Sequence, residues 1–306
     1  MKQQDQHLSG PHDSPRPEDS VVEPLPALAR FAFEWAGTLC DTDHGCFDYH
    51  RMWSMVRLLE TGGALPQGED FFDAELPKVA RDGRLRIILS GGADTGLLTL
   101  AVNASRRSGL TPEIVMLDRC ATPLEQCRLF ARSIGANFHP IQGTIDQLDV
   151  PPADAIMAHS FVPFFPPDAR PALFRDWARN LRPGGKVLMS QRLVPVGGTY
   201  ARIFQPGEIE ERRESLAAAF MQQQPINVDL ETFLEAAERL WRHQLSGPGV
   251  SEDDIKALCA TSGLSVEAIN YAHQTAISPT APKSSMKMRK RAGIVIIKPD
   301  QARSPG

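Results

Sequence analysis

The residues whose type and spacing best suit chemistry form a glycine-rich turn at positions 89–96, with the sequence Leu-Ser-Gly-Gly-Ala-Asp-Thr-Gly. The turn follows a short apolar run typical of a β-strand and leads directly into an apolar helical pattern. Glycine at such a junction lets a ligand approach the backbone amides at the N-terminus of the helix. The turn therefore predicts a small-ligand site, although a tight strand-to-helix turn without a ligand has the same pattern.

The charge of this turn indicates which ligand it suits. A dinucleotide fingerprint requires glycine at its first, third and sixth positions, and the frame from Gly91 to Gly96 has Ala93 in the middle. The Asp94 carboxylate would repel a pyrophosphate, but it would attract a ligand that carries an ammonium and a sulfonium group. This argument favours S-adenosyl-L-methionine over a nicotinamide dinucleotide.

Asp118 is the strongest single candidate for a ligand contact. It ends the apolar run 114–117, where Rossmann-type folds have an acid that accepts hydrogen bonds from ribose hydroxyls. An Asp at the end of a strand can also simply begin the next turn. The prediction therefore depends on the glycine turn upstream as well as on Asp118 itself.

An alternation of strand and helix patterns must position these residues. We expect strands at 84–89, 113–118, 137–141, 153–158, 186–190, 265–271 and 293–298. Helical patterns at 97–107, 123–134 and 169–181 fall between the early strands. The alternation predicts an α/β fold with buried, parallel strands.

The flanking segments have a different composition. Residues 1–26 are rich in proline and in charged and polar residues, so we expect a disordered tail. Residues 27–80 show helical patterns and predict an N-terminal helical lid. Two further helices are expected within 206–243 and another at 251–262.

From residue 84 to residue 298 the chain resembles the class I S-adenosylmethionine-dependent methyltransferases. The glycine turn, Asp118 and the turn Arg182-Pro183-Gly184-Gly185 before the fifth strand carry the likeness. The resemblance implies a Rossmann-like, doubly wound, seven-stranded sheet, mostly parallel with an antiparallel last strand. It also implies that residues 81–306 form the methyltransferase domain, with a helical cap inserted at 206–245 over the substrate.

The same resemblance implies the cofactor contacts. The expected set is Ser90, Gly92, Asp94, Gly96, Asp118, Arg119, Thr144, Ile145, His159 and Ser160. Ser90 stands where the family usually has an acid, and Asp94 replaces the family's middle glycine. Thr144 stands where the family often has an acid as well.

The tip of the fourth strand is the expected place for chemistry, because ligands in such sheets bind outside the carboxyl ends of the strands. Methyl transfer from a sulfonium is an in-line displacement for which alignment of the nucleophile is the main requirement. If a base is needed, His159 is the first candidate, and a cofactor contact or a structural histidine is the alternative. Tyr49, Trp53 and Tyr200 are candidates for contacts to a small-molecule acceptor, and the sequence does not reveal its identity or the methylated atom.

The five cysteines are scattered along the chain, which favours reduced thiols over a disulfide framework. Cys40 and Cys46 bracket two aspartates and a histidine, but their spacing matches none of the usual zinc patterns. We therefore expect no metal site and a metal-independent reaction. The chain has neither an N-terminal apolar segment typical of a signal peptide nor an apolar run long enough for a membrane span, so we expect a soluble, cytoplasmic protein. A homodimer is possible, and the sequence leaves the oligomeric state open.

A net charge of −4 makes nucleic acid an unlikely partner for the molecule as a whole. The exception is a basic cluster, which is typical of a solvated loop or of an anion contact. It consists of Lys283, Lys287, Arg289, Lys290 and Arg291.

Two rival functions remain open. A nicotinamide-dependent oxidoreductase would lack its usual Tyr-x-x-x-Lys pair here, and an inactive cofactor-binding or interaction protein would tolerate the altered glycine turn.

Overall fold

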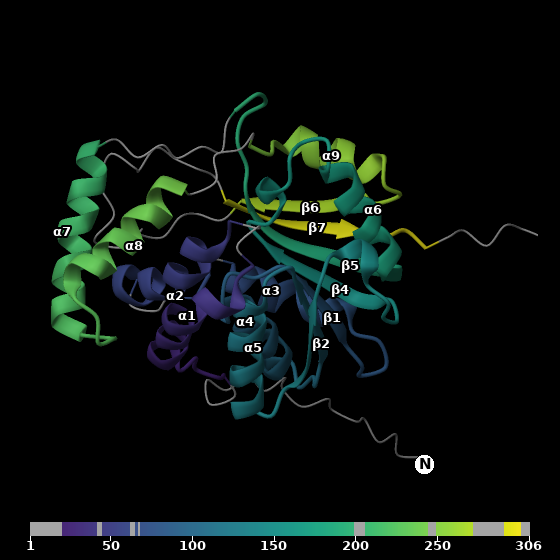
Figure 1. The fold of residues 1–306 in the computed structure, drawn as a ribbon. Coiled ribbons are helices and arrows are strands. Elements are labelled where there is room, and N and C mark those ends of the chain that lie inside the picture. The colour runs from purple at the N-terminus through teal and green to yellow at the C-terminus, as the bar shows by residue number, and fades with distance from the viewer. Residues whose placement is uncertain are drawn as a thin grey trace, which may run out of the picture.

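A computed structural model describes residues 20–41, 45–61, 65–66, 68–198, 206–243, 249–271 and 291–300. Its centre is a seven-stranded sheet with the order β3-β2-β1-β4-β5-β7-β6 (Figure 1). The first five strands are parallel to one another, and β7 is antiparallel to both β5 and β6. The predicted doubly wound sheet with an antiparallel last strand is confirmed.

The strands lie close to their predicted positions. They are β1 (Arg86–Ser90), β2 (Glu113–Asp118), β3 (Asn137–Gln142), β4 (Ala153–His159), β5 (Leu181–Arg192), β6 (Ser265–Tyr271) and β7 (Arg291–Ile297). Only β5 is much longer than expected, because pairing with β4 begins at Leu181, before the glycine pair, and continues past a register shift. The Pro-Gly-Gly turn is therefore part of an irregular strand.

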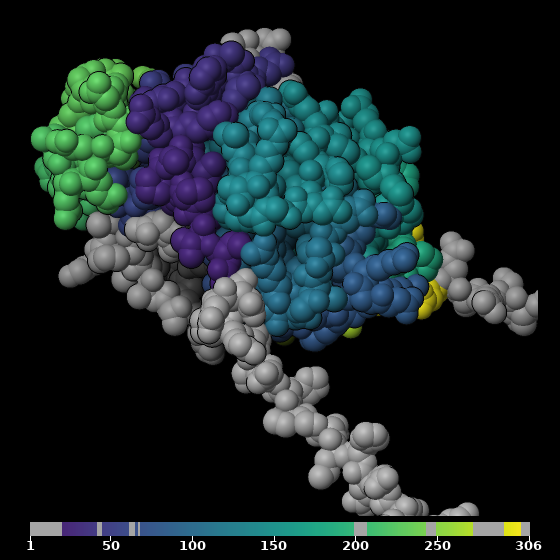
Figure 2. All heavy atoms as spheres, turned by 90° about the horizontal axis from the view of Figure 1, so that it is seen from below, coloured from purple at the N-terminus to yellow at the C-terminus, as the bar shows by residue number. Residues whose placement is uncertain are grey.

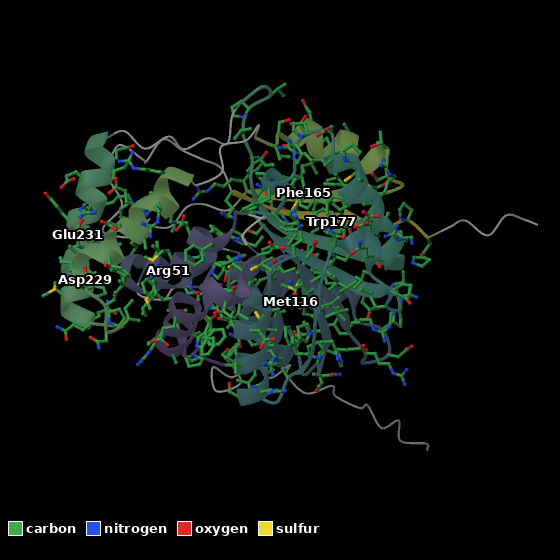
Figure 3. All side chains as sticks on the ribbon, viewed as in Figure 1. Arg51, Met116, Phe165, Trp177, Asp229 and Glu231 are labelled. Carbon is green, nitrogen blue, oxygen red and sulfur yellow. The ribbon has the colours of Figure 1, made fainter. Side chains whose placement is uncertain are left out.

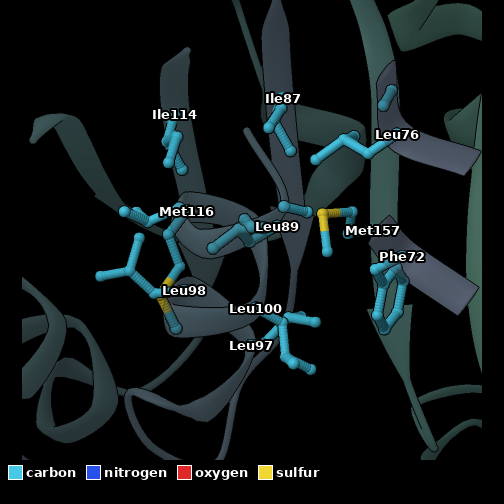
Figure 4. Close-up of a cluster of buried hydrophobic side chains, with 14 of the residues drawn as sticks. Phe72, Leu76, Ile87, Leu89, Leu97, Leu98, Leu100, Ile114, Met116 and Met157 are labelled. Atoms are coloured by element: carbon cyan, nitrogen blue, oxygen red, sulfur yellow. The ribbon is translucent and has the colours of Figure 1, made fainter. Parts of the chain in front are cut away.

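The central strands are buried on both faces, whereas the edge strands β3 and β6 are partly or fully exposed along their length. Successive residues of a strand contribute to different faces. Ile87, Leu89 and Met116 pack with α3 (Glu69–Glu75), α4 (Gly96–Arg107) and α5 (Ala121–Ser133) on one face (Figure 4). Ile88 and Val115 pack with α6 (Arg170–Asn180) and α9 (Glu252–Ala260) on the other face.

Four helices outside the sheet share a third core. They are α1 (Leu25–Leu39), α2 (Phe47–Thr61), α7 (Pro206–Gln223) and α8 (Leu230–His243). Their buried side chains form one cluster that includes Phe33, Met55, Phe220 and Phe233. Figure 2 shows α7 and α8 in green against the purple N-terminal helices. The segments predicted as a lid and a cap are thus one helical unit, although they lie far apart in the sequence.

The end of the predicted disordered tail differs from expectation. The Val21 amide donates to the Asn103 side chain over 2.8 Å, and α1 begins at Leu25 with a proline in its first turn. Proline is tolerated there because the first N–H groups of a helix have no partner within the helix. Residues 20–24 therefore form a strap on α4, residues 25–26 begin α1, and residues 1–19 of the predicted tail lie outside the described residues.

Within the described segments, none of the helices combines the length and the apolar character that crossing a membrane would require.

The shared core of the four helices predicts a large effect of a single truncation. Phe233 is fully buried, and its ring lies 4.4 Å from that of Phe220 and 6.1 Å from that of Phe33. We expect Phe233→Ala to lower the free energy of unfolding by about 3–5 kcal/mol in denaturant titrations. Met221→Ala, an exposed site on α7, is the control and should change it by less than about 0.5 kcal/mol. Equal losses in both variants would contradict the shared core.

Candidate functional site

The glycine turn and the end of β2 meet at one edge of the sheet. Ser90 pairs in register with Leu117, so the turn after β1 lies beside Asp118. The Gly91 amide donates to the Leu117 carbonyl over 2.9 Å, and the Gly92 amide donates to Asp118 Oδ2 over 3.1 Å. Gly91 has a φ of +76°, in the left-handed region that favours glycine. The two features that the sequence singled out therefore form one structure.

Asp118 is held by backbone amides on both sides. Its Oδ1 accepts from the Cys120 amide over 2.8 Å, while Oδ2 accepts from Gly92. Burial raises the pKa of this carboxyl group, and the two backbone hydrogen bonds oppose that rise. The residue remains partly exposed, and each carboxylate oxygen can accept a second hydrogen bond. Two free acceptor sites on a fixed carboxylate suit a pair of neighbouring hydroxyl groups.

The loop after β3 closes around the same point. The Gly143 amide donates to the Asp118 carbonyl over 2.9 Å, and the Gln142 side chain donates to the Arg119 carbonyl over 3.2 Å. Arg119 is exposed and Thr144 is partly exposed, so both line the rim beside Asp118. Ile145 is buried in the core of the sheet, so its side chain does not face this rim as a ligand contact would.

Ser90 does not face the glycine turn. Its hydroxyl is 1% exposed and accepts from the indole N–H of Trp177 on α6 over 3.0 Å. Figure 3 labels Trp177 in the layer of α6. The expected cofactor contact of this side chain is therefore not supported, because successive residues of a strand point to opposite faces.

Asp94 is occupied by an arginine of the N-terminal helices. Arg57 donates through Nη1 to both Asp94 oxygens, over 2.9 and 2.8 Å, and through Nη2 to Glu23. The Gly96 amide also donates to Asp94 Oδ1 over 2.8 Å, and the Thr95 hydroxyl donates to Glu23 over 2.6 Å. The sequence suggested that Asp94 faces a cationic ligand. In the structure the positive charge beside Asp94 is that of Arg57 instead.

The electrostatics of this buried cluster are unbalanced. Arg57, Asp94 and Glu23 are at most 6% exposed, and one guanidinium faces two carboxylates. Burial raises the pKa of Asp94, Arg57 opposes that rise, and the nearby Glu23 adds to it. Buried charges of this kind are tolerated only when they are paired and hydrogen-bonded.

Gly96, the third glycine of the turn, leaves room for the contact between Arg57 and Asp94. A Cβ at Gly96 would lie 2.6 Å from Arg57 Nη1 and 2.7 Å from a ring carbon of Pro66. A Cβ at Gly92 would lie 2.5 Å from the methyl group of Met116, which Figures 3 and 4 label. Gly96 is therefore required by the packing of Pro66, whatever ligand the turn binds, while a side chain at Gly92 would displace the end of the Met116 side chain.

The tip of β4 carries a network centred on an arginine of β7. The Arg291 guanidinium lies 3.1 Å from each of three atoms: His159 Nε2, Ser160 Oγ and Ser190 Oγ. A guanidinium only donates hydrogen bonds, so His159 accepts at Nε2 and carries its proton on Nδ1. Arg291 is 6% exposed in β7, whereas the sequence pattern favoured a solvated loop for it. The other members of the basic cluster lie outside the described residues.

Two further features shape the tip of β4. Ser160 has a φ of +51°, a strained value for a residue other than glycine. The ring of Phe161, the next residue, covers the glycine turn so closely that a Cβ at Gly91 would lie 2.2 Å from it. The strained backbone thus brings an aromatic side chain from β4 onto the turn after β1.

Aromatic residues link the N-terminal helices to the same region. The rings of Tyr49 and Trp53 on α2 stack with their centroids 5.3 Å apart, and Phe164 meets Tyr49 edge-on at 6.0 Å. Phe164 belongs to the short helix η5 (Val162–Phe164) that follows β4. Tyr49 and Trp53 are partly exposed, while the third predicted substrate contact, Tyr200, lies outside the described residues.

Several residues of the site were not predicted from the sequence. Arg57, Glu23 and Arg291 act through contacts between segments 34 to 131 residues apart, which no local pattern reveals. Phe161 and Phe164 had a usable signal, because the run Phe-Val-Pro-Phe-Phe directly follows the predicted tip of the fourth strand. An aromatic run at a strand tip would have been a reasonable candidate for a ligand surface.

Comparison with known proteins gives a consistent result. Residues 88–185 match a family model described as a methyltransferase domain. The carboxy-S-adenosyl-L-methionine synthase of Pseudomonas fluorescens is 29% identical over 33% of this chain and 43% of its own length. The synthase of the same name from Wolinella succinogenes is 29% identical over 43% of this chain and 52% of its own. The chain thus spans about half the length of these curated relatives.

A solved structure supports the fold across more of the chain. An S-adenosylmethionine-dependent methyltransferase from Clostridium acetobutylicum superimposes with a TM-score of 0.51 at 12% identity. The match covers 82% of this chain and 99% of that protein. At this identity the likeness concerns the fold alone.

The buried ion pair predicts a strong effect of removing its cation. We expect Arg57→Met to destabilise the protein by about 3–5 kcal/mol at pH 7, because two buried carboxylates lose their partner. Without Arg57 the pKa of Asp94 rises further, and a carboxyl group whose folded pKa exceeds its unfolded pKa favours folding more as the pH falls. The deficit should therefore shrink between pH 7 and about pH 5 in denaturant titrations.

Arg30→Met, which breaks the exposed pair between Arg30 and Glu34 on α1, is the matched control for this experiment. It should leave the stability nearly unchanged at either pH, since exposed ion pairs contribute little. A deficit of Arg57→Met that grows as the pH falls would contradict the assigned charges.

Proposed function

Because residues 88–185 form a methyltransferase domain of the class I type, we propose that this protein transfers a methyl group from S-adenosyl-L-methionine to a small-molecule acceptor. The observation that carries the proposal is the Asp118 carboxylate, fixed between the amides of Gly92 and Cys120 with acceptor capacity left over. The strand order reverses between β1 and β4, and ligands of such sheets bind in the crevice at that reversal.

The residues around Asp118 suit the adenosine half of this cofactor. In the proposal, Asp118 accepts hydrogen bonds from the two ribose hydroxyls. Arg119 and the Gly143-Thr144 backbone border the adenine, and the Ile145 side chain supports that loop from the core. All of them lie at the carboxyl ends of β2 and β3.

The methionine half meets a turn that is unusual for the family. Asp94 and Ser90 are engaged elsewhere and the Gly92 amide donates to Asp118, which leaves the partly exposed Ala93 in the turn that leads into α4. Amides at a helix N-terminus are suited to the carboxylate of an amino acid. The cofactor supplies an activated methyl group on its sulfonium, so the protein needs to hold and align the reacting groups and exclude water.

His159 acts in this proposal as a positioning residue. Its Nε2 lone pair faces Arg291, so in this arrangement the imidazole has no free acceptor with which to take a proton. Arg291 in turn holds Ser160 and Ser190, and the network fixes the tip of β4. An in-line methyl transfer requires neither a base nor a metal when the acceptor atom is already nucleophilic.

The acceptor is proposed to bind between α2 and the tip of β4. Tyr49, Trp53 and Phe164 offer partly exposed aromatic surface there, and such surfaces are typical of small-molecule sites. We infer a small acceptor because α1, α2, α7 and α8 surround this side of the domain as one packed unit.

Further expectations concern partners and location. The net charge of −4 argues against nucleic acid as the acceptor, and the free thiols suit a reducing compartment such as the cytoplasm. A homodimer is compatible with the proposal. The relatives named carboxy-S-adenosyl-L-methionine synthases support an adenosyl sulfonium ligand, and the catalytic outcome for this chain remains our proposal.

Calorimetric titration tests the cofactor assignment directly. We expect micromolar binding of S-adenosylmethionine and S-adenosylhomocysteine and no binding of NADH. Asp118→Asn should weaken the adenosyl ligands about 10- to 100-fold, because hydrogen bonds to a charged carboxylate contribute about 1.5–3 kcal/mol. The control Asp149→Ala, an exposed acid after β3, should bind like the parent protein. Binding of NADH alone, or of none of the three ligands, would overturn the proposed function.

A further inference from the structure

Four potential metal ligands converge directly behind Asp118. Cys40 follows the last residue of α1, and Cys46 directly precedes α2. His50 lies in the first turn of α2, and Cys120 directly precedes α5. Their three sulfurs and one imidazole nitrogen all lie within 4.8 Å of one another. The four side chains thus come from three helix termini, two of them close together in the sequence and the third about 70 residues further on.

The distances suit a tetrahedral ion. Cys40 Sγ lies 3.4 Å from Cys120 Sγ and 3.7 Å from His50 Nδ1. Ligands about 2.3 Å from a zinc ion at the corners of a tetrahedron lie about 3.8 Å apart, which matches these separations. A disulfide between the two sulfurs would require about 2.05 Å, so Cys40 and Cys120 are two separate thiols here.

The surroundings of the cluster offer a helix N-terminus and a hydroxyl group to the sulfurs and little contact with water. Cys46 and Cys120 both occupy positions directly before a helix, where the positive end of the helix dipole stabilises a negative charge. The Thr122 hydroxyl lies 3.1 Å from Cys40 Sγ and 3.6 Å from Cys120 Sγ, within reach to donate to either sulfur. Cys40, His50 and Cys120 are at most 9% exposed, so water offers these groups little compensation.

We propose that Cys40, Cys46, His50 and Cys120 bind a structural zinc ion. Three thiolates and one imidazole form a closed Cys3His set, which is a common donor set of structural zinc sites. Soft sulfur ligands in a tetrahedron disfavour magnesium, calcium and manganese. The site leaves no position for a substrate, so the ion has a structural role. This proposal departs from the sequence-based expectation that the chain has no metal site.

The site joins the N-terminal helices to the cofactor edge of the sheet. Cys120 is two residues from Asp118, and its own amide donates to Asp118 Oδ1. An ion bound to Cys120 therefore fixes the loop that orients the Asp118 carboxylate, while Cys40 and the α2 ligands fix α1 and α2 on the same loop. The zinc proposal does not depend on methyl transfer, and measurements of metal binding test it independently of the proposed function.

The first test measures metal content. The full chain, purified without metal-affinity chromatography and kept reduced, should contain about one zinc ion per chain by plasma mass spectrometry. Cys46→Ser and Cys120→Ser should lose the ion under the same conditions. Cys259→Ser, which alters a buried thiol on α9 outside the cluster, should retain it. Absence of zinc from the parent chain after zinc addition and dialysis, or equal zinc in all variants, would overturn the proposal.

A second test avoids variants that fold poorly. Cobalt(II) exchanged into the parent chain should show the intense visible bands of a tetrahedral ion and thiolate charge-transfer absorption. A chelator should then expose Cys40, Cys46 and Cys120 to alkylation, as mapped by mass spectrometry, without exposing Cys259. Octahedral cobalt bands, or equal alkylation with and without the chelator, would contradict the site. A Cys40–Cys120 disulfide that persists when the protein is kept with a reductant would contradict it as well.

The Thr122 contact gives a graded test. Thr122→Val keeps the shape of the side chain and removes its hydrogen bond to sulfur. Loss of such a contact to a metal ligand typically weakens binding about 10- to 100-fold, and we expect that change in zinc affinity by competition with a chromogenic chelator. An unchanged affinity would show that the hydroxyl does not support a bound thiolate, contrary to the proposal.

Discussion

The arrangement of this protein depends on one buried cation shared by two carboxylates. Arg57 of α2 reaches into the turn after β1 and binds Asp94, and the same guanidinium binds Glu23 from the strap that precedes α1. The cluster joins three segments that sequence patterns treat as independent: the end of the tail, the lid and the first loop of the sheet. A buried carboxylate without a partner is strongly destabilising. If any of the three segments moved away, a buried charge in the remaining ones would lose its partner.

This constraint explains how an altered glycine turn remains a well-formed turn. Asp94 accepts from the Gly96 amide at the start of α4, so its charge also stabilises the N-terminus of the helix. Asp94, which stands in the middle of the glycine turn, thus helps to hold the N-terminal helices in place. The carboxylate at this edge that stays partly exposed is Asp118, which two backbone amides fix in place and which we propose as the cofactor contact.

The sequence predicted the sheet well because each strand is short, apolar and bounded by turn residues. Positions 113–118 were assigned as in the structure, since Asp118 ends an uninterrupted apolar run.

The site was predicted less completely, because its charged residues interact across the fold. No periodicity in residues 47–61 indicates that Arg57 will neutralise Asp94. The metal cluster was missed for the same reason, as Cys40 and Cys46 have the wrong spacing alone and Cys120 lies 80 residues away from Cys40. The end of the proline-rich N-terminal segment was predicted to be disordered because proline interrupts helices. Proline is also common in the first turn of a helix, and α1 begins in this way.

The position of β7 has a consequence for how the site is assembled during synthesis. This strand comes after every other described strand in the sequence, yet it lies between β5 and β6 and carries the arginine that holds the tip of β4. A domain generally folds as a unit. The network at the tip of β4 can therefore form only after β7 has left the ribosome, because Arg291 is the residue that joins His159 and Ser160.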